Sequence, residues 1–253
     1  MKRLLFILTL ASSTALDAAP ASPAPRPVQD FSNLTQDKRN EFAEIYQEAS
    51  RLFQQKRIFE TLEKLDAAER IFPDSAALLN LRGVALIEFR SFDKATAAFT
   101  RALEINPEMP GVKFNLAEIA FVTHDWKAAA ERFEALIPQL SKDDTGLLRL
   151  IEYKILLSKL KLGQVDDARK LATKYDFLDD SPFYYYAQAS LAYHDGKPED
   201  AQQWLGRATR IFRTSALLSP WQDTLMEYNR KPGGDDAPVL GIPVPEAAPT
   251  TEE

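Results

Sequence analysis

Two histidines and four pairs of adjacent aspartates are the side chains of this sequence best suited to chemistry. A histidine can act as a general acid or base or bind a metal, and paired carboxylates can share a proton or bind Ca²⁺. The histidines are His124 and His194. The acidic pairs are Asp143 with Asp144, Asp166 with Asp167, Asp179 with Asp180, and Asp235 with Asp236.

The spacing of these residues favours neither a metal site nor a catalytic site. Neither histidine has a second histidine at metal-ligand spacing, and the neighbouring acids, Asp125 and Asp195, fit helix caps better. Adjacent aspartates point apart, and none has the spacing of a calcium loop, so we expect all four pairs to be solvated in turns or in the C-terminal tail. We therefore predict no catalytic residue, no metal site and no cofactor, in a protein that is not an enzyme.

The composition indicates a helical protein that does not bind nucleic acid. Of the 253 residues, 45% are hydrophobic, which is normal for a chain that buries a core, and only 9 are glycine. The 31 basic and 37 acidic residues give a formal net charge of −6. Such a chain repels nucleic-acid phosphates rather than attracting them.

The N-terminal residues have the three-part layout of a secretory signal peptide. Lys2 and Arg3 precede an apolar run over residues 4–11, and small residues follow. This run is much shorter than the roughly 20 residues of a spanning helix. We predict a signal peptide over residues 1–21, cleaved after Ala15 or Ala21, and export to the periplasm of a bacterial cell envelope or beyond it. No integral membrane span is expected after its removal; the alternative is a retained N-terminal anchor.

Proline-rich segments flank the rest of the chain. Residues 22–34 are predicted to be a Pro/Ala-rich linker, and residues 230–253 a disordered, acidic, Pro-rich tail. Both should act as extended, solubilising spacers. The apolar stretch over residues 238–245 leaves open a docking motif in the tail.

A helical hairpin repeats between these flanks, with a regular spacing that slips after Pro138. Pro73 and Pro107 end two similar segments, and we call the interval between these two prolines the period. Apolar residues three and four apart over residues 92–105 predict an amphipathic helix. This helix should stop at Asn106, because the following proline disfavours helical geometry there. An earlier apolar stripe over residues 79–87 predicts the first helix of the same hairpin.

Gly83 lies inside that first helix, where glycine costs about 1 kcal/mol relative to alanine. Close approach of a neighbouring helix would explain it. A shift by one period in either direction reaches Ala49 and Ala117, which are also small. The same shift relates the second-helix positions Ala95 to Ala129, Phe99 to Phe133, and Ala102 to Leu136.

This period, with small residues where helices cross, resembles the tetratricopeptide repeat family. The resemblance covers residues 35–229 and is carried in its best copy by Gly83, Leu86, Phe92, Ala95, Phe99, Ala102 and Pro107. Glu48 and Arg82 depart from the family pattern, which usually has leucine there.

The resemblance implies an all-α fold, a right-handed superhelical solenoid of about five helical hairpins plus a C-terminal capping helix. The hairpins would span residues 42–75, 76–109, 110–140, 147–181 and 182–214, and the cap residues 215–229. Pro220, which follows Ser219, is interpreted as the start signal of the capping helix.

The resemblance also implies a protein-binding groove, because in this family the first helix of each hairpin lines a concave side that holds a peptide or helix. The corresponding side chains here are Tyr46, Phe53, Asn80, Phe114, Glu118, Phe121, Tyr153, Tyr186 and Tyr193. This set is mainly aromatic, and aromatic anchors dominate binding energies. We therefore predict an exported adaptor or scaffold that binds a peptide or amphipathic helix of another protein, for assembly or organisation of a cell-envelope complex.

Two alternatives to this groove remain open. Several rings, above all Phe53, Phe121 and Tyr193, could pack between neighbouring hairpins instead of binding a partner. The same aromatic groove could instead carry a small hydrophobic molecule or lipid. The sequence predicts neither the identity of a partner nor an oligomeric state.

Overall fold

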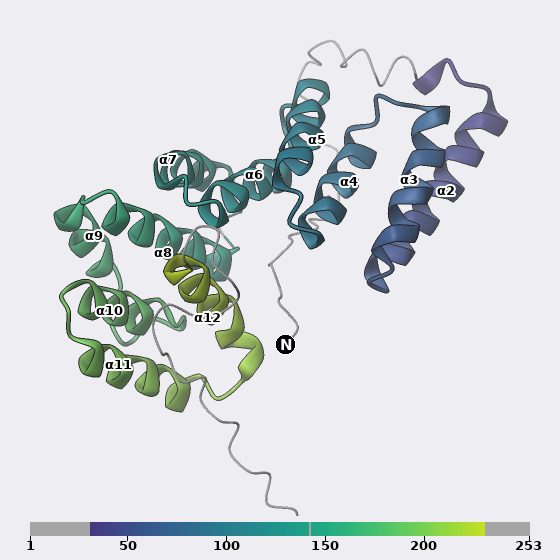
Figure 1. The fold of residues 1–253 in the computed structure, drawn as a ribbon. Coiled ribbons are helices and arrows are strands. Elements are labelled where there is room, and N and C mark those ends of the chain that lie inside the picture. Colours follow the sequence, from purple (N-terminus) through teal and green to yellow (C-terminus); the bar gives the residue numbers. More distant parts are fainter. Residues whose placement is uncertain (1–30, 142, 231–253) are drawn as a thin grey trace, which may run out of the picture. The chain divides into compact units, whose positions relative to one another are not determined.

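The computed structural model describes residues 31–141 and 143–230 (Figure 1). This part of the chain contains eleven α-helices, one short 3-10 helix (Ile137–Gln139) and no strand. The predicted all-α fold is confirmed. The predicted signal peptide, most of the predicted linker, the tail from residue 231 and the pair Asp235 and Asp236 lie outside the described residues.

The chain divides into two compact units between Ile119 and Ala120, within α6 (Pro110–Val122). The helices of the first, here called the N-terminal unit, are α2 (Gln36–Gln54), α3 (Ile58–Ile71), α4 (Ala76–Glu88), α5 (Phe92–Ile105) and the start of α6. The C-terminal unit contains the end of α6, α7 (Trp126–Leu136), α8 (Thr145–Lys161), α9 (Val165–Ala172), α10 (Phe183–His194), α11 (Pro198–Ile211) and α12 (Ser215–Asn229). No helix in the described ranges is both long and apolar enough to cross a membrane.

The N-terminal unit is built from consecutive helical pairs. Helix α2 packs against α3, α4 packs against α5, and α3 also contacts α4, so the pairs lie side by side (Figure 1). The amphipathic helix predicted over residues 92–105 is α5. Asn106 then has extended backbone (φ −136°, ψ 99°), because Pro107 follows it. Phe72, one period earlier and before Pro73, is extended in the same way.

A neighbouring helix approaches Gly83 closely, as the sequence predicted. A Cβ at this position would lie 2.4 Å from Cε1 of Phe99 in α5, and the Phe99 ring is fully buried. A side chain at position 83 would therefore have to displace a ring of the core. Six further repeat positions named from the sequence are buried: Ala49, Ala95, Ala102, Ala117, Ala129 and Phe133. Leu86 and Phe92 are half-buried, and Pro107 is exposed.

A residue with left-handed backbone lies in the turn of each hairpin. Gly163 and Gly196 have φ values of 74° and 72°. Lys56, Arg90 and His124 lie in the three preceding turns, each one period after the last, with φ values of 60°, 53° and 65°. This conformation costs a non-glycine residue about 1–2 kcal/mol. The turn geometry is therefore repeated even where the residue is not glycine.

The C-terminal unit continues the pairing and then departs from it. Helix α8 packs against α7 and α9, α10 packs against α11, and α10 also contacts α8. Helix α12 follows α11 after the short link over positions 212–214 and returns to pack against α8 (Figure 1).

The last helix begins earlier than its proline suggested. Helix α12 starts at Ser215, so the interpretation of Pro220 as its start signal is wrong, and Pro220 lies inside the helix. The residues before the proline are held in the helix because Leu218 packs into the core, where it is 4% exposed. Burial of this side chain outweighs the backbone hydrogen bond that proline cannot donate.

Candidate partner-binding surfaces

Tyr46 of α2 and Asn80 of α4 form the accessible part of the predicted groove in the N-terminal unit. Both side chains are half-buried. The Tyr46 hydroxyl donates to the backbone carbonyl of Ala77, 3.5 Å away and one turn before Asn80 on the same helix. The Asn80 Oδ1 atom is buried and accepts no hydrogen bond from the described residues. A donor brought by a partner would reach this oxygen only after the half-buried Asn80 side chain turns outward, and pairing would then satisfy it.

Three other predicted groove residues of this unit are buried. Phe53 is 9% exposed, Phe114 1% and Glu118 5%. Their surfaces are therefore not open to a partner in this structure. Partner binding by these side chains stays a prediction.

In the C-terminal unit the structure brings two predicted groove residues together. The rings of Tyr153 and Tyr186 lie 5.9 Å apart at 76°, and the Tyr153 hydroxyl is 3.0 Å from the hydroxyl of Ser190. Tyr153, Tyr186 and Phe121 are almost fully buried, whereas Tyr193 is half-buried. Burial raises the pKa of both Tyr153 and Tyr186 above the usual value for tyrosine. These phenols therefore stay neutral at physiological pH.

Helix α12 covers these rings. The indole of Trp221 lies 5.3 Å from the Tyr153 ring, 5.7 Å from Tyr186 and 6.4 Å from Phe183. We call the surface formed by Tyr153, Phe183 and Tyr186 the aromatic face. The sequence predicted a closing helix but not that it lies on this surface. The available signal was the apolar stripe of α12, with the buried residues Leu218, Trp221, Leu225 and Tyr228.

The second half of α12 is held by the turn between α6 and α7. The Tyr228 ring lies 5.8 Å from Trp126, and Nζ of Lys161 lies 4.4 Å from the Tyr228 ring centroid. His124 Nε2 is 3.2 Å from the backbone carbonyl oxygen of Glu227. Burial raises the pKa of Tyr228 to about 12 and lowers the pKa of Lys161.

A carboxylate of α12 lies in an unfavourable place. Burial and, after it, the charge of Glu227 on the same helix raise the pKa of Asp223 to about 6, against the opposing charge of Lys154 of α8. The Lys154 side chain is itself buried, with Nζ 4.8 Å from the Phe121 ring centroid. Asp223 and Lys154 thus place charged groups where α12 packs against the rest of the unit. Burial of a charged Asp223 weakens the docking of α12 at neutral pH.

The two histidines and the aspartates that follow them pack or pair within the fold. His124 stacks on Trp126 at 4.6 Å and 18°, while His194 is the last residue of α10. Asp125 caps α7 by accepting from the Ala128 amide at 3.1 Å, as expected. Asp195 lies at the C-cap of α10, and its carboxylate accepts from Arg169 at 2.6 Å, which lowers its pKa.

Among the acidic pairs within the described residues, one lies at the start of a helix and another accepts hydrogen bonds in a loop. Asp166 and Asp167 lie in the first turn of α9, not in a turn between helices, and there they favour the helix dipole. Asp179 accepts from Arg149 at 3.0 Å and from Ser181. The described residues contain no group of three or more potential metal ligands.

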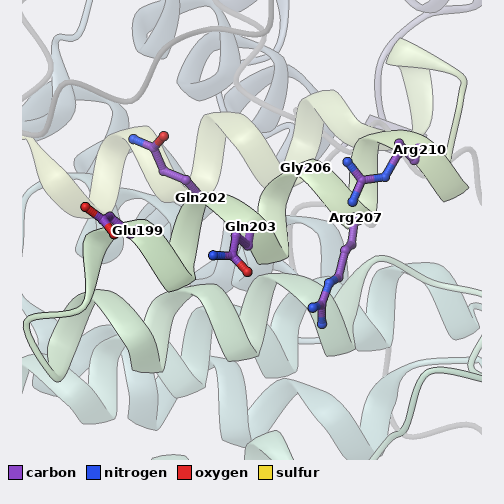
Figure 2. Close-up of a pocket in the computed structure, with 6 residues that line it drawn as sticks. All are labelled: Glu199, Gln202, Gln203, Gly206, Arg207 and Arg210. Atoms are coloured by element: carbon purple, nitrogen blue, oxygen red, sulfur yellow. The ribbon is translucent and has the colours of Figure 1, made fainter.

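An open hollow of about 450 Å³ lies along α11. Figure 2 shows its six lining residues on that helix: Glu199, Gln202, Gln203, Gly206, Arg207 and Arg210. The guanidinium of Arg207 lies 4.3 Å from the ring of Trp204. A lining of amides and charged groups does not suit the hydrophobic cargo of the alternative function at this place.

Comparison with known proteins agrees with the sequence resemblance. Two family models, both described as tetratricopeptide repeat, match residues 46–110 and 86–150. No curated protein sequence matches the chain.

Three solved structures share the fold. The structure titled "Crystal structure of YrrB: a TPR protein with an unusual peptide-binding site" has a TM-score of 0.54 and 15% identity, and the match covers 74% of this chain and 94% of YrrB. MamA AMB-1 has a TM-score of 0.52 at 12% identity, with 69% and 93% of the two chains covered. PilF of Pseudomonas aeruginosa has a TM-score of 0.51 at 15% identity, with 77% and 91% covered.

The paired helices, the glycine at the crossing of α4 and α5, and both family models agree with one another. The fold is that of protein–protein interaction scaffolds. The chain carries tetratricopeptide repeats over residues 46–150.

Proposed function

We propose that this protein is an exported scaffold that binds a polypeptide segment of another protein, and that it serves the assembly or organisation of a cell-envelope complex. The observation that carries the binding proposal is the pair Tyr46 and Asn80. Both are half-buried, they lie on neighbouring first helices, and Asn80 Oδ1 accepts no hydrogen bond from the described residues. YrrB, a TPR protein with an unusual peptide-binding site, shares the fold of this chain and thereby supports the same use here.

The chemistry of this pair favours a peptide as the ligand. A peptide offers an apolar side chain to the Tyr46 ring, which already stacks on Phe42 at 6.2 Å. It also offers a backbone amide to Asn80 Oδ1, once this side chain turns outward to expose its buried oxygen. Export is supported by the sequence alone, through Lys2, Arg3 and the apolar run over residues 4–11.

Photo-crosslinking in the native host tests the binding site. A benzophenone amino acid at position 46 or 80 should yield adducts with one defined polypeptide. The same group at Lys94, an exposed residue of α5, is the matched control. The absence of adducts at both groove positions, or the same adducts at Lys94, would reject this site.

A variant series separates binding from folding. Asn80→Ala should change the free energy of unfolding by less than about 1 kcal/mol, because the side chain is half-buried. Tyr46→Ala removes the ring that would contact the peptide and should cost about 1–3 kcal/mol. Both should reduce the yield of the adducts obtained from a crosslinker at Ser50, one turn after Tyr46. Unchanged yields would contradict the proposed contacts.

Export is tested by sequencing the N-terminus of the protein purified from cell fractions. A mature chain that begins after Ala15 or Ala21 and lies in the envelope fraction is the expected result. A full-length chain in the cytosol would contradict it.

A further inference from the structure

A helix of the same chain, α12, covers the aromatic face. Trp221 of α12 contacts Tyr153 and Tyr186, two residues that the family resemblance assigns to partner binding. With Trp221 in place, Tyr153 is 0% exposed and Tyr186 2%. A partner and α12 would therefore need the same surface.

The contacts of α12 are those of an amphipathic helix bound to a surface. Its buried apolar residues Leu218, Trp221, Leu225 and Tyr228 follow at intervals of three, four and three, so they form one stripe along the helix. Met226, which lies away from this stripe, is 42% exposed. Two aromatic anchors two turns apart are the pattern by which helices bind grooves in other complexes.

Several features make α12 easier to release than the paired helices. Pro220 interrupts its backbone hydrogen bonds, and no side chain caps its N-terminus. Its charged residues Asp223 and Glu227 repel each other, and burial raises the pKa of Asp223 to about 6. The helix packs against α8, whereas α8 and α10 are each also paired with a second helix of their own hairpin.

We propose that α12 is an internal, displaceable ligand of the aromatic face, and that an amphipathic helix of a partner with the same aromatic spacing replaces it. This inference rests on the proposed function only in that the partner is a polypeptide. It adds a second binding surface, a ligand class and a regulated state, in which α12 closes the surface until a competitor is present.

Native-state hydrogen exchange on the full, unmodified chain gives the first test. The amides of α12 should exchange through an opening of lower free energy than the amides of α8 and α10. A single opening free energy shared by all three helices would overturn the proposal, because α12 would then leave only when the whole unit unfolds.

A synthetic peptide with the sequence of residues 213–230 is the probe for the second test. The full chain should bind it weakly, and the variant Trp221→Ala/Tyr228→Ala should bind it at least about ten-fold more tightly, because its aromatic face is open. A peptide carrying the same two replacements should not bind. The full-chain variant Met226→Ala, altered on the exposed side of α12, is the control and should bind the peptide as weakly as the wild type.

Equal affinity of the wild type and the opened variant, or no binding by the opened variant, would overturn the proposal. Circular dichroism shows whether the opened variant keeps its helices. If it does not fold, the decision rests on the exchange experiment, which needs no substitution. Both tests use the chain's own segment, so their failure leaves the crosslinking test at Tyr46 and Asn80 unaffected.

Discussion

The ring of Phe99 occupies the space that a Cβ on Gly83 would need, with Cε1 only 2.4 Å from that position. One period earlier, Ala49 and Leu65 hold the equivalent positions, and both are fully buried. One period later, Phe133 lies with Ala117, and both are fully buried. The need for glycine is therefore specific to the crossing of α4 and α5 and does not follow from the phenylalanine alone.

Gly83→Ala should lower the free energy of unfolding by about 1–3 kcal/mol, because the buried Phe99 ring cannot move without disturbing its neighbours. Phe99→Leu alone should cost about 1 kcal/mol through lost packing. The double variant recreates the pair found at Ala49 and Leu65, so it should be less destabilised than the sum of the single variants. Denaturant unfolding followed by circular dichroism measures all three, and simple additivity would contradict the shared contact.

Gly163 is needed for its backbone and not for space. Nothing lies within 4 Å of a Cβ at this position, yet its φ is +74°. Gly163→Ala should therefore cost about 1–2 kcal/mol of stability. Gly146, which has equally open surroundings at the start of α8, is the control, and Gly146→Ala should be neutral or stabilise by up to about 1 kcal/mol. Equal effects in thermal unfolding would refute the backbone explanation.

The ion pair of Glu152 with Lys174 joins α8 to the segment after α9, and the Glu152 side chain is 2% exposed. Lys174→Met should cost about 2 kcal/mol, because it leaves a buried carboxylate without its partner. Adding Glu152→Gln should recover part of this loss. If the double variant were no more stable than Lys174→Met in urea unfolding, the pair would not be the cause.

Docking of α12 should strengthen as the pH falls. The pKa of Asp223 is about 6 when α12 is docked and has a reference value of 3.8, so the docked state binds more protons between these values. Its contribution is fully favourable below about pH 4 and is lost as the pH rises through about 6. The groups facing it are Glu227, Lys154 and Tyr186.

The measurement for this prediction is the melting temperature of the C-terminal unit at about pH 5 and about pH 7.5, in the wild type and in Asp223→Asn. The variant should show a smaller difference between the two conditions and a higher value at neutral pH. An unchanged pH difference would assign the effect to other groups.

The sequence could predict the features that depend on neighbouring residues. The end of α5 at Ile105 follows from Pro107, and the small residue at Gly83 follows from a period visible in the chain itself. The left-handed backbone of His124 follows the same period, because Arg90 precedes it by one period and Lys56 by two, and both have the same conformation.

Features set by distant contacts could not be predicted in this way. Arg82 departs from the family pattern because its guanidinium pairs with Asp66 at 2.7 Å and Glu69 at 2.9 Å on α3. Tyr153 is covered by Trp221, which lies two hairpins further along the chain. A periodic pattern indicates which side of a helix is apolar, but not which segment of the chain returns to cover it.

The link between α11 and α12 spans only positions 212–214. So short a tether gives α12 an effective concentration on the order of millimolar at its own surface. A free partner at micromolar concentration is far more dilute than α12 is at this surface. The partner must therefore bind the surface correspondingly more tightly than α12 does in order to displace it. Inserting residues into the link would therefore tune the threshold of the switch without altering one contact.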